Sequence, residues 1–303
     1  MKRILITTGN GMFGKALAHE LIDKEVNLRI MVRDKSSCSI TGPRVEIVTG
    51  DLDKPESLIP VMKGVDTVFL SSPIGPGIVE REAAVIEAAK AADTGQIIKI
   101  FGAVRHEGDK LDMMHVKVLE KLKDSGIGWT LISPNSVMET SLLGQAQSVK
   151  YVRALYGSSG HGKVGLVALK NIAEASSHVI MTDGHDGQNY ELTGPEAIDM
   201  YEVATRFSAA LDAKIDYIDL TEEQMTSMFM KFDKTMTPER MELEVLCHLR
   251  AWKEGRASLV TETYEKLTGK DPLSTEAWVQ KHQELFRKGM WPMVLAKLMR
   301  RFS

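Results

Sequence analysis

The 303-residue chain has little cysteine, little net charge and no long apolar run. Its two cysteines, Cys38 and Cys247, lie far apart without partners at the usual ligand spacings, which argues against disulfides and a structural zinc site and fits a reducing compartment. The 38 basic and 41 acidic residues leave a net charge of −3, so the charge indicates neither nucleic acid nor an anionic membrane as partner. No apolar run is long enough for a membrane span or a signal peptide, so we expect a cytoplasmic protein. The isolated cysteines lead us to expect no bound metal.

The sequence does contain enough apolar material for a globular core. Hydrophobic residues make up 43% of the chain, which excludes a disordered protein. The 24 glycines and 10 prolines follow no period, which excludes a collagen-like or low-complexity chain. The length suits one large α/β domain, or such a domain with a smaller lobe.

Short apolar runs alternate with helix-like stretches through the first half of the chain. The runs are rich in β-branched residues and almost continuously apolar, as in strands that are covered on both faces. In the stretch 79–92, apolar residues recur at helical spacing, whereas Glu80, Glu82 and Glu87 point elsewhere. The alternation predicts a Rossmann-type doubly wound parallel sheet over residues 1–150. Strands are expected at 4–7, 28–32, 45–48, 67–71, 97–101 and 129–133, and helices at 13–23, 56–63, 79–92 and 114–123.

The rhythm changes after about residue 140, and residues 151–303 are expected to form a smaller, mostly helical lobe on the substrate side. Helices are expected near 172–181 and 201–211, strands at 189–193 and 215–219, and mainly helix after Thr221. The small-residue loop 157–162 contains His161 and could close over a ligand, but a mobile hairpin tip is the favoured interpretation.

A glycine-rich loop between the first strand and the first helix is the strongest motif. Its spacing is Gly9-x-Gly11-x-x-Gly14, and it stands where a dinucleotide fingerprint requires it. Glycine lets the backbone approach a pyrophosphate, and the helix N-terminus supplies amide donors and a positive dipole. A tight turn alone would explain one or two of these glycines but not all three. The predicted cofactor-binding residues here are Thr8, Gly9, Asn10, Gly11, Met12, Phe13 and Gly14.

The end of the second strand bears on the choice of cofactor. An NAD site usually has an acid there, whereas this sequence has Arg33, with Lys35 close by. A guanidinium can bind a 2′-phosphate with two hydrogen bonds, so the sequence favours NADP(H) over NAD(H). Asp34 keeps NAD as an alternative, and a solvated surface role for Arg33 is the other.

Further candidates follow the other strands, because open α/β sheets bind ligands at the carboxyl ends of their strands. Asp51 could accept a hydrogen bond from the adenine amino group, but a turn or helix-cap aspartate explains it equally well. The candidates at these ends are Asp51, Leu52, Ser71, Ser72, Pro73, Phe101, Gly102, Pro134 and Asn135.

Together these features resemble the NmrA-like family of atypical short-chain dehydrogenases. Further matching segments fall in family order and extend the resemblance to about residue 286; they lie at 50–58, 64–70, 125–132, 189–195 and 267–272. The resemblance implies a Rossmann domain, an NADP-type cofactor and a cleft between the lobes. The family contains both reductases and dinucleotide-binding sensors, so the resemblance leaves both open.

The candidate catalytic residue is His115. No tyrosine has a lysine four residues later, so the usual Tyr-x-x-x-Lys pair of short-chain dehydrogenases is absent. His115 stands where related NmrA-like reductases carry His or Lys, although Leu119 replaces a frequent Glu and Ser133 a frequent Arg. Histidine titrates near neutrality and could donate a proton or polarise a carbonyl. A satisfied, partly buried histidine is the alternative.

The sequence therefore predicts an NADPH-dependent oxidoreductase that reduces a small apolar or aromatic carbonyl, quinone or imine. A redox sensor without turnover, and an enzyme of non-redox acid–base cyclisation or addition, are the alternatives. The segment 287–303 is basic and amphipathic, with no acidic residue. Such a tail could contact a membrane, but packing on its own domain or on a second subunit, as in a homodimer, is favoured.

Overall fold

The computed structural model describes residues 1–102 and 104–287 and is built on a seven-stranded sheet. The strand order is β10-β6-β5-β4-β1-β2-β3, and every neighbouring pair is parallel. This confirms the predicted Rossmann-type α/β fold. The strands are β1 (Arg3–Ile6), β2 (Asn27–Val32), β3 (Val45–Thr49), β4 (Thr67–Leu70), β5 (Gln96–Ile100), β6 (Gly128–Pro134) and β10 (Gln188–Leu192).

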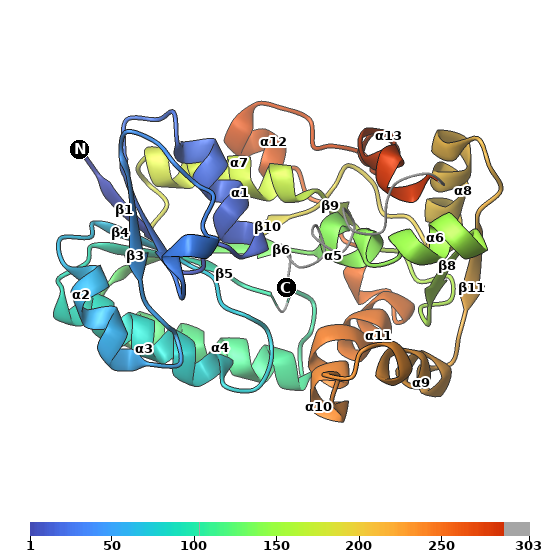
Figure 1. Cartoon of the computed structure of the whole chain (residues 1–303), viewed down its shortest axis with the longest axis horizontal. Helices are drawn as coiled ribbons and strands as arrows, with labels where there is room; N and C mark the ends of the chain where they lie inside the picture. The colour runs from blue at the N-terminus through green and yellow to red at the C-terminus, as the bar shows by residue number, and fades with distance from the viewer. Residues whose placement is uncertain (103, 288–303) are drawn as a thin grey trace.

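Helices cover both faces of the sheet (Figure 1). Successive residues of a strand point to opposite faces, so Ile4 and Ile6 of β1 pack in one apolar cluster and Leu5 in the other. One face carries α1 (Met12–Leu21), α7 (Leu169–Met181) and α12 (Thr263–Thr268), and the other carries α2 (Leu58–Met62), α3 (Ile78–Ala91) and α4 (Lys110–Asp124). Short 3₁₀ turns lie at Lys35–Ser37, Pro55–Ser57 and Arg256–Ser258.

The sheet takes in more of the chain than we expected. The strand predicted at 189–193 is β10, which pairs with β6 at the edge of the main sheet, and the helix predicted at 172–181 is α7, which packs on α1. A boundary at residue 150 therefore does not separate the sheet from the smaller lobe. Periodicity identifies a strand correctly but cannot tell which sheet it joins, because the pairing depends on long-range contacts.

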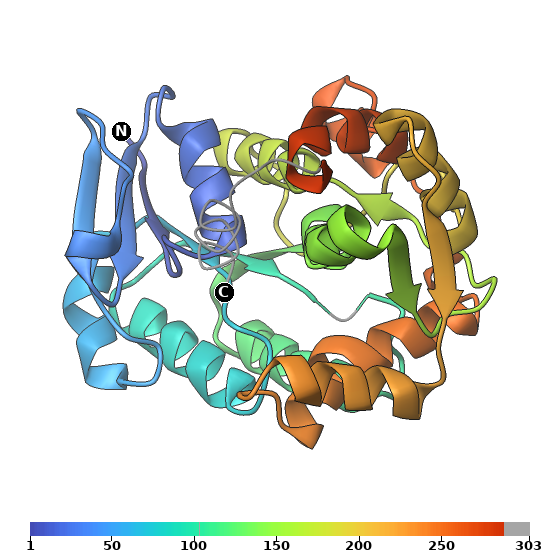
Figure 2. The same ribbon diagram turned by 45° about the vertical axis from the view of Figure 1, so that its right-hand side comes forward.

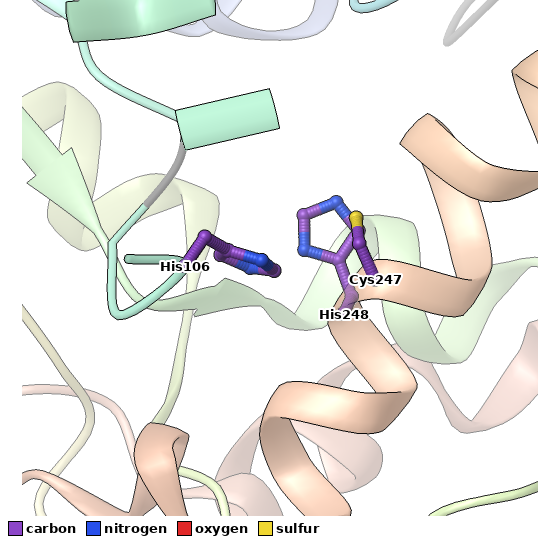
Figure 3. Close-up of side chains that lie close together, drawn as sticks. All are labelled: His106, Cys247 and His248. Atoms are coloured by element: carbon purple, nitrogen blue, oxygen red, sulfur yellow. The ribbon is translucent and has the colours of Figure 1, made fainter. Parts of the chain in front are cut away.

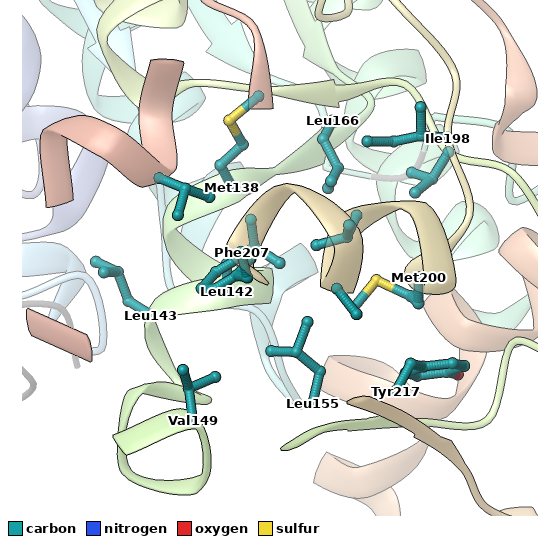
Figure 4. Close-up of a cluster of buried hydrophobic side chains, with 14 of the residues drawn as sticks. Met138, Leu142, Leu143, Val149, Leu155, Leu166, Ile198, Met200, Phe207 and Tyr217 are labelled. Atoms are coloured by element: carbon teal, nitrogen blue, oxygen red, sulfur yellow. The ribbon is translucent and has the colours of Figure 1, made fainter. Parts of the chain in front are cut away.

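The smaller lobe is mostly helical and lies beside the sheet domain (Figure 2). Its core gathers apolar residues from helices far apart in sequence, with Phe207 and Leu142 near the centre (Figure 4). Its helices are α5 (Met138–Leu143), α6 (Ala146–Val152), α8 (Met200–Leu211), α9 (Glu222–Phe232), α10 (Pro238–Met241), a π-helical turn (Glu242–Leu246), α11 (Cys247–Lys253) and α13 (Thr275–Phe286). Two short parallel pairs complete it: β7 (Ser136–Val137) with β9 (Leu166–Val167), and β8 (Ala154–Gly157) with β11 (Asp216–Asp219).

The interpretation of loop 157–162 as a mobile hairpin tip is wrong. The strand that precedes it, β8, pairs in parallel with β11, so the loop does not join the two strands of a hairpin. Ser159 is fully buried, and a methyl group on Gly162 would lie 2.0 Å from the carbonyl oxygen of Trp252. His161 is anchored through Nδ1, which lies 3.0 Å from Asp199 Oδ2. Small residues are present here because the backbone packs closely against α11.

The start of α4 brings the two parts of the chain together. Lys110 pairs with Glu239 of α10, and the Arg256 guanidinium donates to the carbonyl oxygen of Arg105 at 2.6 Å. The lobe therefore meets the sheet domain at the carboxyl end of β5. None of the helices described is both long and apolar enough to cross a bilayer. The predicted tail, apart from Arg287, lies outside the described residues, so its role stays a prediction.

Candidate functional site

The glycine loop joins β1 to α1 with very close backbone contacts. A methyl group on Gly9 would lie 2.1 Å from Ile30 Cγ2, and one on Gly14 would lie 2.1 Å from the carbonyl oxygen of Thr8. Real side chains do not approach so closely, so only glycine lets α1 start this near the strands. Gly11 is the N-cap of α1 and offers no side chain to cap the first-turn amides. These amides remain donors of the kind that bind a phosphate.

Two hydrogen bonds connect the glycine loop to neighbouring strand ends. Thr8 Oγ1 and Ser71 Oγ, which follows β4, lie 2.5 Å apart. The Asn10 side-chain amide donates at 2.7 Å to Ser37 Oγ, in the 3₁₀ turn that follows β2. The structure thus brings together candidates that the sequence could only place at separate strand ends. Met12 and Phe13 are half-buried in the first turn of α1.

The basic residues after β2 remain available for a ligand. Arg33 and Lys35 are exposed, and neither side chain has a hydrogen bond or ion pair with another described residue. Asp34 is engaged locally, because its carboxylate accepts from the Ser36 amide at 2.9 Å and from Ser36 Oγ at 2.7 Å. These bonds lower the pKa of Asp34. The region thus offers two free cations and one carboxylate already bound in a turn.

The candidates after β3 and β6 are mostly held by the protein itself. Asp51 Oδ1 accepts from the Asp53 amide at 3.2 Å, which is a turn contact, and Leu52 is buried in the core. The Asn135 amide donates to the carbonyl oxygen of Ala257 at 2.8 Å, and Pro134 is buried at the end of β6. Pro73, after β4, is exposed.

A buried polar network lies at the carboxyl ends of β4 and β5. Ser72 Oγ donates to Glu82 Oε1 at 2.6 Å, and the other Glu82 oxygen pairs with Lys99 Nζ. Lys99 Nζ also lies 3.2 Å from His115 Nδ1. The side chains of Lys99 and Glu82 are 0% and 1% exposed, so the expectation that Glu82 points away from the core is wrong. That expectation assumed that a carboxylate would avoid the buried face of the helix, since a lone buried charge is costly. Here the Glu82 carboxylate has the cationic partner Lys99, which offsets this cost.

This network determines how His115 is protonated. A lysine ammonium can only donate, so His115 Nδ1 must accept, and the ring proton sits on Nε2. Burial, then the positive charge of Lys99, lowers the pKa of His115 well below its ordinary value of 6.5. His115 Nε2 is buried and has no hydrogen-bond partner among the described residues. The residue is thus a neutral donor, not the satisfied histidine of the alternative interpretation.

The surroundings of His115 Nε2 are apolar and tight. A methyl group on Gly102 would lie 3.3 Å from this nitrogen, and the Phe101 ring lies 5.0 Å from the imidazole, centroid to centroid. Phe101, Ile74 and Met114 pack against a small buried cluster of Leu111, Leu243 and Cys247. The predicted residues Phe101 and Gly102 therefore lie next to His115, as a common site requires.

Lys99 and Glu82 were not among the site residues predicted from the sequence. A lysine within the apolar run Ile97, Ile98, Lys99 and Ile100 was a visible signal, since a strand covered on both faces buries every side chain. Its partner could not be identified in the same way, because several glutamates lie on the neighbouring helix.

These features define the class of protein. A parallel sheet in Rossmann order, a glycine cradle that opens a helix and polar groups at adjacent strand ends are the elements of a dinucleotide-binding domain. The glycine loop fits the pyrophosphate of such a cofactor, because methyl groups on Gly9 and Gly14 would collide with Ile30 and Thr8 and displace the start of α1.

Comparisons with known proteins identify the family. Residues 9–183 match the profile of the NAD(P)H-binding family. The chain is 31% identical over 234 residues to the NAD(P)H azoreductase of Xenophilus azovorans. The matched region covers 75% of this chain and 82% of the azoreductase. This chain belongs to the NAD(P)H-binding family.

Solved structures share the fold. One is an NADPH-dependent quinone oxidoreductase from Escherichia coli, complexed with NADPH, with a TM-score of 0.81 at 22% identity. The superposition covers 93% of this chain and 99% of the oxidoreductase chain. The negative transcriptional regulator NmrA, in complex with NAD, gives a TM-score of 0.72 at 14% identity over 92% and 94% of the two chains. The family match confirms the predicted NAD(P)H-binding domain, and the likeness to NmrA and to the quinone oxidoreductase is one of fold.

Proposed function

We propose that this protein is an NADPH-dependent reductase of a small apolar or aromatic carbonyl, quinone or imine. The observation that carries the proposal is the Nε2–H of His115, which has no partner within residues 1–102 and 104–287 and lies next to Phe101 and Gly102 at the carboxyl end of β5. A buried donor without a partner costs stability, so its retention is expected where it serves a ligand.

The proposed cofactor contacts start at the glycine cradle. The first-turn amides of α1 would bind the pyrophosphate, with Thr8 and Asn10 fixing the loop. Arg33 and Lys35 would bind the 2′-phosphate, which distinguishes NADPH from NADH. Asp51 is the candidate partner of the adenine. When bound, NADPH supplies a hydride.

His115 would act on the group that receives the hydride. Negative charge develops on the oxygen or nitrogen of the acceptor, and a preorganised Nε2–H donor stabilises it. A neutral imidazole can do this at neutral pH without first gaining a proton. Lys99 and Glu82 are positioning residues, because they hold the ring and its tautomer from the Nδ1 side.

The apolar surroundings support the substrate class. Phe101, which lies against the His115 ring, packs with Ile74 and Met114 on one small apolar cluster, and these residues would favour an acceptor with little charge. The azoreductase and the quinone oxidoreductase with which this chain was compared are named for the reduction of organic acceptors.

The test is NADPH consumption with a panel of quinones, imines and aromatic carbonyls. The wild type should oxidise NADPH, and His115→Ala should lose about 10²–10³-fold in kcat, the range for removal of one stabilising donor. His19→Ala, on the exposed face of α1, is the matched control and should keep full activity. His115→Ala should still bind NADPH.

Other outcomes would contradict the proposal. Tight NADPH binding with no turnover on any acceptor would indicate a sensor. Product formation without a change in the redox state of the cofactor would indicate cyclisation or addition. Equal loss in both histidine variants would remove the assigned role of His115.

A further inference from the structure

Three side chains with metal-binding chemistry meet where the smaller lobe contacts the sheet domain. His106 lies in the loop between β5 and α4, and Cys247 and His248 are the first two residues of α11. Figure 3 shows the His106 ring extending toward the other two side chains. One ligand atom from each lies within 4.8 Å of the others. None of these residues belongs to the candidate cofactor site.

We propose that His106, Cys247 and His248 form a binding site for a divalent transition metal, with Zn²⁺ as the best fit. One thiolate and two imidazoles are a ligand set that zinc favours, and three protein ligands leave a fourth position for water. Tetrahedral zinc holds its ligand atoms roughly 3.4–3.7 Å apart, so binding requires the side chains to close by about 1 Å.

The backbone before the two helical ligands is unusual. Residues Glu242–Leu246 form a π-helical turn that leads directly into Cys247. Such a turn inserts extra backbone into a helix, changes the direction of the residues that follow, and is frequent at functional sites. The side chains of consecutive residues in a regular helix point about 100° apart, so an ion bound by both Cys247 and His248 must lie in the angle between their two side chains.

A second shell already orients His106. Its Nδ1 lies 3.0 Å from Asp109 Oδ2, and Arg256 in turn lies 3.5 Å from the same carboxylate oxygen. A histidine that donates from Nδ1 to a carboxylate keeps the lone pair of Nε2 for a metal, which is the usual arrangement of zinc-bound histidines.

The Cys247 thiol donates to the Leu243 carbonyl oxygen at 3.4 Å and is the protonated form of a metal ligand. Binding of a divalent ion forms the metal–sulfur bond, breaks the S–H bond and releases one proton to water. No oxidation or reduction is involved.

The test is titration of the purified chain with Co²⁺, a spectroscopic substitute for Zn²⁺, under reducing conditions. The wild type should develop a thiolate-to-cobalt charge-transfer band that one equivalent of Zn²⁺ removes. Cys247→Ala should abolish the band, whereas Cys38→Ala, which changes the other free cysteine, should keep it. Asp109→Asn should weaken Co²⁺ binding about 10–100-fold, because it removes the orienting carboxylate.

Absence of the band in the wild type overturns the proposal, and so does a band that survives in Cys247→Ala or disappears in Cys38→Ala. Should Cys247→Ala not fold, His248→Gln replaces it, since His248 is only half-buried, and it should weaken binding or remove the band. The metal alone is the probe, so the result does not depend on reductase activity.

Discussion

The buried pair of Glu82 and Lys99 provides the sharpest prediction about stability. Glu82→Gln removes a charge but keeps the size of the side chain and a partner for Ser72. Lys99 would then keep a buried positive charge with neutral acceptors only: the new amide oxygen, the Ile100 carbonyl oxygen and His115 Nδ1, the last two at 3.2 Å. Removal of one member of such a pair typically costs about 3–5 kcal/mol, because the other charge stays buried without compensation.

The matched control is Glu46→Gln. Glu46 pairs with Arg29 at 2.8 Å, but its side chain is 56% exposed. Exposed pairs contribute about 0–1 kcal/mol, so this change should be nearly neutral. The double variant Glu82→Gln/Lys99→Met should recover much of the loss, because no uncompensated charge remains.

Urea unfolding of the wild type and these three variants measures the free energy of unfolding of each. The reasoning fails if Glu82→Gln costs no more than Glu46→Gln. It also fails if Glu82→Gln/Lys99→Met loses as much free energy of unfolding relative to Glu82→Gln as Glu82→Gln loses relative to the wild type, since the two charges would then act independently.

Three further predictions concern the cofactor loop and His115. Gly14→Ala places a methyl group 2.1 Å from the Thr8 carbonyl oxygen, so it should lower the free energy of unfolding by about 1–3 kcal/mol and abolish NADPH binding. Gly144→Ala, whose methyl group would lie 3.7 Å from the Thr140 carbonyl oxygen, should do neither. Calorimetry with NADPH compares the two variants. Arg33→Ala should weaken NADPH binding by roughly 10–100-fold and NADH binding far less, and equal weakening would refute the 2′-phosphate contact. Because the folded-state pKa of His115 is lowered, the unfolded chain binds the proton more tightly below pH ~6.5, and stability falls as pH falls. His115→Gln should reduce that slope by up to about 1.4 kcal/mol per pH unit, which urea unfolding at pH 7.5 and 5.5 would show; an unchanged slope would mean that His115 is not buried as a neutral group.

The glycine loop between β1 and α1 could be predicted well because it is local. The glycine spacing, the strand before it and the helix after it lie within one short segment, and backbone sterics demand glycine at Gly9 and Gly14. The position of the basic residues just after β2 was predicted by the same logic, since a strand end is also a local feature; their contact with a 2′-phosphate stays a prediction. The predicted turn role of Asp51 could not be separated from an adenine contact, because both use the same residue type at the same place.

The sequence alone determined the class of fold and the glycine turn that opens α1, because periodicity, glycine spacing and strand ends are short-range patterns in consecutive residues. Tertiary structure decided which distant groups meet: that β10 joins the main sheet, that Lys99 finds Glu82 and His115, and that His106 meets Cys247 and His248. The physical reason is that a buried charge or ligand is stable only with its partner, and the partner is chosen by packing between elements that no local pattern connects.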